Sequence, residues 1–98
     1  MIARVTSLQV KLGQADEAKK FFDEVVYPAV KGKRGFHSGY LVTNRKTGAC
    51  LSIAFWDTEA DALADEKDGS YQKRTNMAKE LVARPISHEI YEVVSEYP

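Results

Sequence analysis

Alternating apolar and polar positions predict four β-strands along the chain. These segments are rich in β-branched and aromatic side chains, which favour strands, and they span residues 2–10, 36–43, 49–56 and 87–94. Only the short sequence NRKTG separates the second segment from the third, and its Asn44 and Gly48 are typical turn residues. We therefore predict that the second and third strands form an antiparallel hairpin.

The region between the first two strands has the periodicity of a helix. Within 14–31, apolar residues recur at spacings of three and four, so they form one stripe on a helix surface. They are Ala18, Phe21, Phe22, Val25, Val26, Ala29 and Val30. Pro28 falls inside this pattern and lacks a backbone N–H, so we expect a kink or a distinct last turn there.

A second helical region follows the hairpin. Thr58 is a good N-cap for a helix in the sequence DTEADALADEK, and we expect the acids of 57–68 to form a solvated face. The residues KDGS then interrupt this helix. Ser70 can cap a further helix over 71–83, which Pro85 ends.

The order of elements is β-α-β-β-α(α)-β, which predicts a single ferredoxin-like α+β domain over residues 1–98 with helices on one face of an antiparallel sheet. The strand 49–56 is apolar on both sides, because Leu51, Ile53 and Phe55 oppose a row of small side chains. A sheet face lined by such residues is larger than monomers usually expose. We therefore expect a homodimer through the open sheet face, paired as a dimeric α/β barrel.

Length and charge narrow the possible partners. A chain of 98 residues is one domain that buries only about 60–65% of its unfolded surface, which also favours association. Basic and acidic residues balance at 14 each with no basic block, so we expect no nucleic-acid partner. No apolar run approaches the ~20 residues of a membrane span. The single cysteine and the strand-like N-terminus, which does not resemble a signal peptide, predict a cytoplasmic protein.

A row of small side chains ends in a large aromatic one on the predicted hairpin. Even-numbered positions carry Ser38, Cys50, Ser52 and Ala54, and the row closes with Trp56. Such a row can admit close helix packing or leave room for a ligand. If Phe21, Phe22 and Val25 fill the space, no cavity remains. A pocket of about 300 Å³ with converging polar groups would favour binding or catalysis.

Three stretches of the chain resemble a known family. They are MIARVTSLQVKLGQADEAKKFF, KRGFHSGYLVTNRKTG and LSIAFWDTEADALA, which are similar to the antibiotic biosynthesis monooxygenase-like domains of the dimeric α/β-barrel superfamily. The shared features are a helix ending before Gly-Phe, a Gly-Tyr-Leu strand, and a Trp followed by an acid and a helix cap. The resemblance implies a homodimer with a pocket between sheet and helices in each subunit. Its members include cofactor-free oxygenases of quinols and polycyclic phenols, haem-degrading enzymes and domains without known activity.

The haem-degrading branch of this family fits the chain poorly. Its pattern has an Asn in the first strand, a Trp at the end of the third and a His on the helix after Ser-x-x-Phe. Trp56 matches, but the first strand offers only Thr6 and Ser7, and GSYQKRTNMAK contains no His to serve as an axial ligand. We expect no haem and no other cofactor. No His/Cys/Asp cluster has metal-ligand spacing, so we also expect no metal.

Three residues are candidates for catalysis. Trp56 could wall the pocket and stack on a flat substrate, or it could be a core aromatic. Tyr40 is expected to share its face and could hydrogen-bond a phenol, or it could only pack. His37 could act as a base, because its ordinary pKa lies near neutrality, or it could be an exposed or interface residue; the same holds for His88.

Five residues are candidates for substrate contact: Ser38, Ser52, Phe22, Tyr71 and Arg4. Arg4 and Arg74 could fix an anionic substrate. The alternatives are surface placement for Arg74 and, for Arg4, pairing with Glu89 or Glu92 on the last strand. Cys50 is expected to be a small buried strand residue.

Two functions follow from these observations. The first is a cofactor-independent monooxygenase of small electron-rich aromatic substrates, quinols or phenols. In that chemistry the deprotonated substrate donates electrons to oxygen, and the protein supplies a dry cavity, a base or hydrogen-bond partner, and stabilisation of the anion. The alternative is a non-catalytic dimeric domain that binds a small molecule or serves as an accessory subunit.

Overall fold

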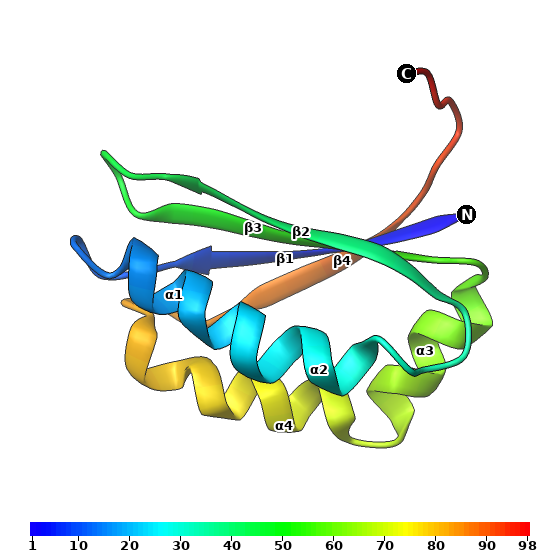
Figure 1. The fold of residues 1–98 in the computed structure, drawn as a ribbon, viewed down its shortest axis with the longest axis horizontal. Coiled ribbons are helices and arrows are strands. Elements are labelled where there is room, and N and C mark those ends of the chain that lie inside the picture. The colour runs from blue at the N-terminus through cyan, green and yellow to red at the C-terminus, as the bar shows by residue number, and fades with distance from the viewer.

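One antiparallel sheet carries all the helices on a single face (Figure 1). The computed structural model describes all 98 residues. The strands are β1 (Ile2–Gln9), β2 (Phe36–Asn44), β3 (Ala49–Trp56) and β4 (Ser87–Glu92), in the order β2-β3-β1-β4 across the sheet. This arrangement confirms the ferredoxin-like α+β fold expected from the order of elements. It leaves the second face of the sheet open, and pairing of that face with a second copy stays a prediction.

The first helical region changes its hydrogen-bond pattern before Pro28. It consists of α1 (Ala15–Phe21), a π-helical turn (Phe22–Val26) and α2 (Tyr27–Val30). The Tyr27 N–H donates to the Phe22 carbonyl, five residues back. Pro28 is the second residue of α2, where its missing N–H costs no hydrogen bond within that last turn. The distinct last turn expected at Pro28 is therefore confirmed, and a wider turn precedes it.

The second helical region consists of α3 (Glu59–Lys67), α4 (Ser70–Met77) and a 3₁₀ turn (Ala78–Leu81). The N-cap expected at Thr58 is confirmed, because its Oγ1 accepts the Asp61 N–H at 3.1 Å. The cap expected at Ser70 is wrong by one residue. Gly69 takes that position with a φ of 84°, and Ser70 begins the helix. None of the helices is both long enough and apolar enough to cross a membrane.

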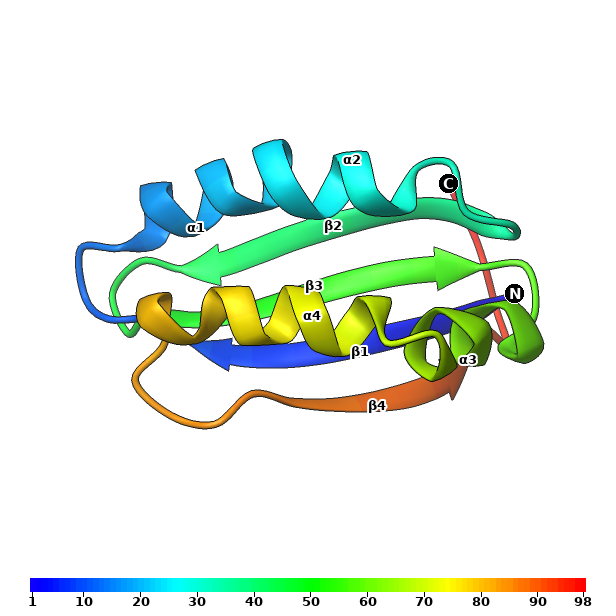
Figure 2. The same ribbon diagram turned by 90° about the horizontal axis from the view of Figure 1, so that it is seen from below.

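The register of the central strands decides which side chains lie under the helices. In the β1–β3 pair, Arg4 lies opposite Ala54 and Thr6 lies opposite Ser52. Even-numbered residues of both strands therefore share the helix-covered face, because side chains alternate along a strand. Figure 2 shows this face with α1 and α2 over β2, and α4 over the central strands.

A β-bulge at the start of β2 reverses the predicted face of that strand. Phe36 lies opposite Trp56, but the register then shifts, so that Ser38 lies opposite Phe55 and Tyr40 opposite Ile53. An extra residue moves every following side chain to the other face. Ser38 therefore does not belong to the row of small side chains, and the prediction that Tyr40 shares a face with Trp56 is wrong.

Trp56 is the largest fully buried side chain of the chain, with 0% of its surface exposed. Phe36 packs edge-on against it with ring centroids 5.5 Å apart, and the Arg4 guanidinium lies 5.4 Å from the indole centroid. Cys50 is buried in the hydrophobic core cluster that also contains Leu8. The expectation that Cys50 is a small buried strand residue is confirmed.

The open face of the sheet exposes large apolar side chains. The exposed fractions are 62% for Tyr40, 45% for Val42, 40% for Leu51 and 50% for Tyr91. These residues come from β2, β3 and β4, so the exposed apolar surface extends across the sheet. Apolar side chains gathered over one face in this way are typical of an interaction surface.

Candidate functional site

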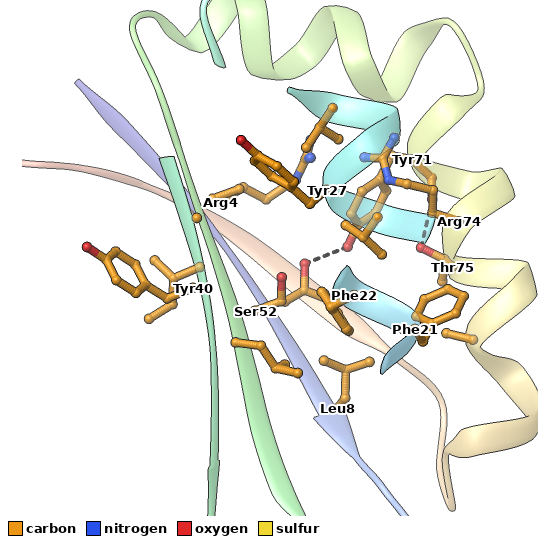
Figure 3. Close-up of a pocket in the computed structure, with 18 of the residues that line it drawn as sticks. Arg4, Leu8, Phe21, Phe22, Tyr27, Tyr40, Ser52, Tyr71, Arg74 and Thr75 are labelled. Atoms are coloured by element: carbon orange, nitrogen blue, oxygen red, sulfur yellow. Dashed lines mark hydrogen bonds between the residues drawn. The ribbon is translucent and has the colours of Figure 1, made fainter. Parts of the chain in front are cut away.

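A cavity of about 220 Å³ lies between the sheet and the helices (Figure 3). Its floor includes the small side chains of β1 and β3: Thr6, Ser52 and Ala54. One wall comes from the first helical region: Phe21, Phe22, Val26, Tyr27 and Val30. The other wall comes from α4 and the turn after it: Tyr71, Arg74, Thr75 and Ala78. Phe21 and Phe22 thus line the space without filling it, although the cavity is smaller than the volume we expected for a binding site.

The lining of this cavity includes hydroxyl groups from β1, β3 and α4. The Thr6 Oγ1 and the Tyr71 hydroxyl are 2.8 Å apart and share a hydrogen bond. Ser52 lies directly across from Thr6 on the neighbouring strand. Burial raises the pKa of Tyr71 and outweighs the opposite effect of the bond with Thr6. The phenol of Tyr71 is therefore neutral at physiological pH and can donate a hydrogen bond.

A buried acid, Asp65 of α3, holds the charged residues at one end of the cavity. It accepts hydrogen bonds from Arg4 at 2.7 Å and from Arg74 at 2.6 Å, and Lys33 lies 2.9 Å away. Burial alone would raise the pKa of Asp65, but its bonds with Arg74, Lys33 and Arg4 outweigh burial and lower the pKa to about 2. The carboxylate is therefore ionised at neutral pH. The predictions of a solvated acid face at this position and of a surface location for Arg74 are both wrong.

Arg4 pairs with the helical layer and not with the last strand. Its Nη2 bonds Asp65, and its Nη1 lies 3.5 Å from a carboxylate oxygen of Glu66. The predicted pairing with Glu89 or Glu92 is wrong. Glu89 lies opposite Val5 and points to the open face, and Glu92 lies opposite Ile2 at the strand end. The Arg4 guanidinium also stacks 4.3 Å from the centroid of the Tyr71 ring.

The charges are layered with respect to the cavity. Arg4 and Arg74 line it, whereas Asp65 lies behind them and does not. A ligand in the cavity therefore meets the cationic side of the cluster first, and the field at that end favours a negative charge. The opposite end is apolar, with Leu8 and Phe22 among its lining residues.

The structure brings four of the predicted substrate-contact residues together. Ser52, Phe22, Tyr71 and Arg4 all line the cavity. The fifth, Ser38, lies on the open face of the sheet.

None of the three predicted catalytic residues points its side chain into the cavity. Trp56 is fully buried and does not line the cavity, so of its two predicted roles the structure fits the core aromatic and not the wall that stacks on a substrate. Tyr40 borders the cavity, but its ring packs edge-on against Phe55 and points away from the other labelled side chains in Figure 3. His37 is exposed at the bulge, where its Nδ1 lies 3.1 Å from the Ser38 hydroxyl.

Thr6 and Asp65 were not predicted as site residues, although the spacing of each in the sequence indicates a buried position. Thr6 alternates with Arg4 along β1, which places both on one face. Asp65 lies three residues after Ala62, and that spacing puts both on the buried side of α3. The chain has no cluster of three or more His, Cys, Asp or Glu side chains arranged to hold a metal ion.

Comparison with known proteins identifies the fold. No protein-family model matches the sequence, and no curated protein matches it either. ActVA-Orf6, a monooxygenase of Streptomyces coelicolor solved with nanaomycin D, superposes with a TM-score of 0.84 at 13% identity over 99% of this chain and 90% of that one. SnoaB, a cofactor-independent oxygenase of Streptomyces nogalater, superposes with a TM-score of 0.80 at 15% identity over 99% and 96%.

A haem-degrading protein has the same fold. MhuD of Mycobacterium tuberculosis, solved with two haems in its active site, superposes with a TM-score of 0.79 at 18% identity over 100% of both chains. Further similar structures carry the provisional name antibiotic biosynthesis monooxygenase. At these identities the likeness establishes a shared fold, and at that level it confirms the resemblance drawn from the sequence.

Proposed function

We propose that this protein is a cofactor-independent monooxygenase of small electron-rich aromatic molecules, quinols or phenols. The observation that carries the proposal is the polarity of the cavity. Apolar side chains such as Phe22 and Val26 can hold an aromatic ring, while the Tyr71 hydroxyl and the two arginines converge at one end. The shared fold with SnoaB and ActVA-Orf6 is in keeping with oxygenase chemistry.

The proposed reaction uses the substrate as its own electron source. The phenolate oxygen lies among the Thr6, Ser52 and Tyr71 hydroxyls, and the guanidinium groups stabilise its charge. The phenolate transfers one electron to O₂, and the resulting phenoxyl radical and superoxide combine to form a C–O bond. The ring carbon then loses its proton and the O–O bond breaks. One oxygen atom stays as a quinone carbonyl and the other leaves as water, so a phenol and O₂ give a quinone and water.

No histidine lines the cavity to take the phenol proton at neutral pH. The one carboxylate among its lining residues, Asp23, is largely exposed and accepts a hydrogen bond from Lys19 at 2.7 Å, and the raised pKa of Tyr71 keeps that phenol protonated. We therefore expect the substrate to bind as an anion after losing its proton to solvent. The rate should then rise with pH through the pKa of the substrate, and it should follow that pKa when the substrate is changed.

Oxygen uptake tests this function directly. Purified protein is incubated with a panel of quinols and naphthols in air and under nitrogen, and oxygen consumption and quinone formation are measured. We expect equal amounts of oxygen consumed and quinone formed with at least one substrate. Tyr71→Phe should slow the reaction, whereas Tyr97→Phe, which alters an exposed tyrosine near the C-terminus, should not. No uptake across the panel would contradict the proposal.

A second candidate function is binding without turnover. The cavity volume of about 220 Å³ and the lack of a histidine among its lining residues favour this alternative. It predicts that naphthols bind with a measurable heat while oxygen is not consumed.

Haem degradation is not proposed, although MhuD has the same fold. No histidine lines the cavity, and the ring of His88 lies on the outer side of α4, in contact with Tyr71. The residues present therefore do not match the axial ligation that the haem-degrading branch is expected to use.

The open face of the sheet is the surface on which we expect a second copy of the chain to pack. Its exposed Tyr40, Val42 and Leu51 supply the apolar contact. A two-fold axis would use the same surface twice, so one chain provides both sides of the interface. The dimer would leave the cavity of each subunit accessible, because the cavity lies on the opposite face.

A further inference from the structure

A second hollow, here called the groove, lies on the outer side of α4. It is bounded by α4, the segment that leads into β4, and His88 of β4. Three residues line both the groove and the cavity: Tyr71, Thr75 and Ile86. The two hollows therefore adjoin along these three side chains, and a ligand with an extension could occupy both.

The groove carries positive charge that the protein does not neutralise. Lys79 and Arg84 both line it, both are exposed, and neither makes an ion pair. The groove also contains one acid, Glu66, whose Oε1 lies 2.9 Å from His88 and whose Oε2 lies 3.5 Å from Arg4 without a hydrogen bond. Two unpaired cations against one acid leave the groove with an excess of positive charge.

We propose that the groove binds a carboxylate carried on a side arm of the aromatic substrate. In this arrangement the ring occupies the cavity, the arm runs along Tyr71, Thr75 and Ile86, and the carboxylate meets Lys79 and Arg84. The proposal rests on the proposed function, because the aromatic ring must enter the cavity. It adds a substrate class: electron-rich phenols with an acidic side arm a few bonds away from the ring.

The physical argument joins size with charge. A cavity of about 220 Å³ holds a small ring system, so further parts of a larger substrate must lie outside it. Arginine matches a carboxylate with two parallel N–H donors, and lysine adds a flexible ammonium group. Both lie at the surface, where each such contact is modest. Together they should favour an acid over a neutral isostere by about 5- to 10-fold in affinity.

Tyr71 is the residue that connects the two hollows. Its hydroxyl is held by Thr6 at 2.8 Å, its ring lies under Arg4 at 4.3 Å, and the His88 ring packs on it at 4.8 Å between centroids. These contacts hold the Tyr71 ring in place from both sides. In the proposed arrangement the arm of the substrate passes beside this ring. The phenol group and the arm of a substrate would therefore be positioned by the same side chain.

Calorimetric titration with three probes tests this assignment under nitrogen, where no turnover occurs. The probes are 1-naphthol, 1-naphthol with a propanoate arm beside the hydroxyl, and the matching propanamide. For the unaltered protein we expect the acid to bind about 5- to 10-fold more tightly than the amide, and this preference should shrink at high salt.

Two charge-matched double variants locate the effect. Lys79→Gln with Arg84→Gln should abolish the preference for the acid while leaving the affinity for 1-naphthol unchanged. Lys67→Gln with Lys73→Gln removes the same charge from exposed positions of α3 and α4 outside the groove, and it should keep the preference. Circular dichroism confirms that both variants are folded.

The outcomes separate the two proposals. If 1-naphthol binds but the acid and the amide bind equally, the groove proposal is overturned and the proposed function stands. A preference that survives in the Lys79/Arg84 variant would also overturn it, because the acid would then be held elsewhere, for example by the cavity arginines. If none of the probes binds, both proposals fall together.

Discussion

The two faces of the sheet are built from opposite chemistry, although the same strands supply both. Under the helices lie Arg4, Thr6 and Ser52, whose polar side chains line the cavity. On the other face lie Leu51 and Tyr40, which have apolar surface and no helix to cover them. The chain thus buries several polar side chains beside its apolar core and leaves large apolar ones exposed on the open face.

This contrast separates a face that is covered within one chain from one whose large apolar side chains stay exposed. Burial of Asp65 is tolerated because Arg4, Arg74 and Lys33 satisfy its charge. No helix of the chain covers the open face. Its apolar side chains therefore remain in contact with water, and burying them would be favourable. Chemistry is therefore expected under the helices and association on the opposite side.

The largest effect is expected from Asp65→Ala on the covered face. The substitution leaves three cations without their shared acceptor, and breaking a buried pair typically costs about 3–5 kcal/mol in the free energy of unfolding. Urea denaturation followed by circular dichroism measures the loss. Asp57→Ala, at an exposed acid, is the matched control and should change stability little. Equal losses in the two variants would contradict the role given to Asp65.

A charge on the open face should act on association instead. Leu51→Glu places a carboxylate on the exposed apolar face and should weaken dimerisation by about 2–4 kcal/mol. Sedimentation velocity at micromolar concentration measures the monomer fraction. Asn76→Glu, which adds the same charge to an exposed position of α4, should leave the dimer intact. If the unaltered protein is already a folded monomer at this concentration, the dimer proposal is wrong.

Acid should destabilise the covered face in a defined window. The pKa of Asp65 is lowered from 3.8 to about 2, so its stabilisation is present above the unfolded value and is lost as pH falls through the folded one. About 2 kcal/mol should disappear between roughly pH 5 and pH 2. Urea denaturation at several pH values follows this loss. The Asp65→Ala variant should lack this part of the pH dependence, and Leu51→Glu should keep it.

The smallest effect is expected from the hydroxyl of Tyr71. Tyr71→Phe keeps the ring between Arg4 and His88 but removes one hydrogen bond, so a bound phenol should lose about 1 kcal/mol of affinity. Calorimetry with 1-naphthol measures this change, with Tyr97→Phe as the control. An unchanged affinity would show that the hydroxyl does not contact the ligand.

Alternation in the sequence predicted the central strands well. β3 begins and ends where it was expected, and its even-numbered residues share the covered face with Arg4. The predicted cavity contacts Ser52 and Arg4 follow directly from this regular pairing. Local periodicity is sufficient here because neither strand contains an irregularity that would change its face.

The remaining errors come from features that a single segment does not encode. The bulge between Phe36 and Ser38 is invisible in a pattern whose next residue, Gly39, has no side chain to reveal its face. The Asp65 cluster is equally hidden, because its partners come from β1, from α4 and from the loop before β2. Charge pairing across such distances in the sequence has no periodic signature.

The bulge also has a consequence for comparing this chain with others of the same fold. A relative without the extra residue would present its equivalents of Ser38 and Tyr40 to the interior and that of Leu41 to the exterior. An alignment that matches residues by order alone would therefore equate side chains that lie on opposite surfaces. Transfer of function between such chains along β2 must begin from the pairing of strands, residue by residue.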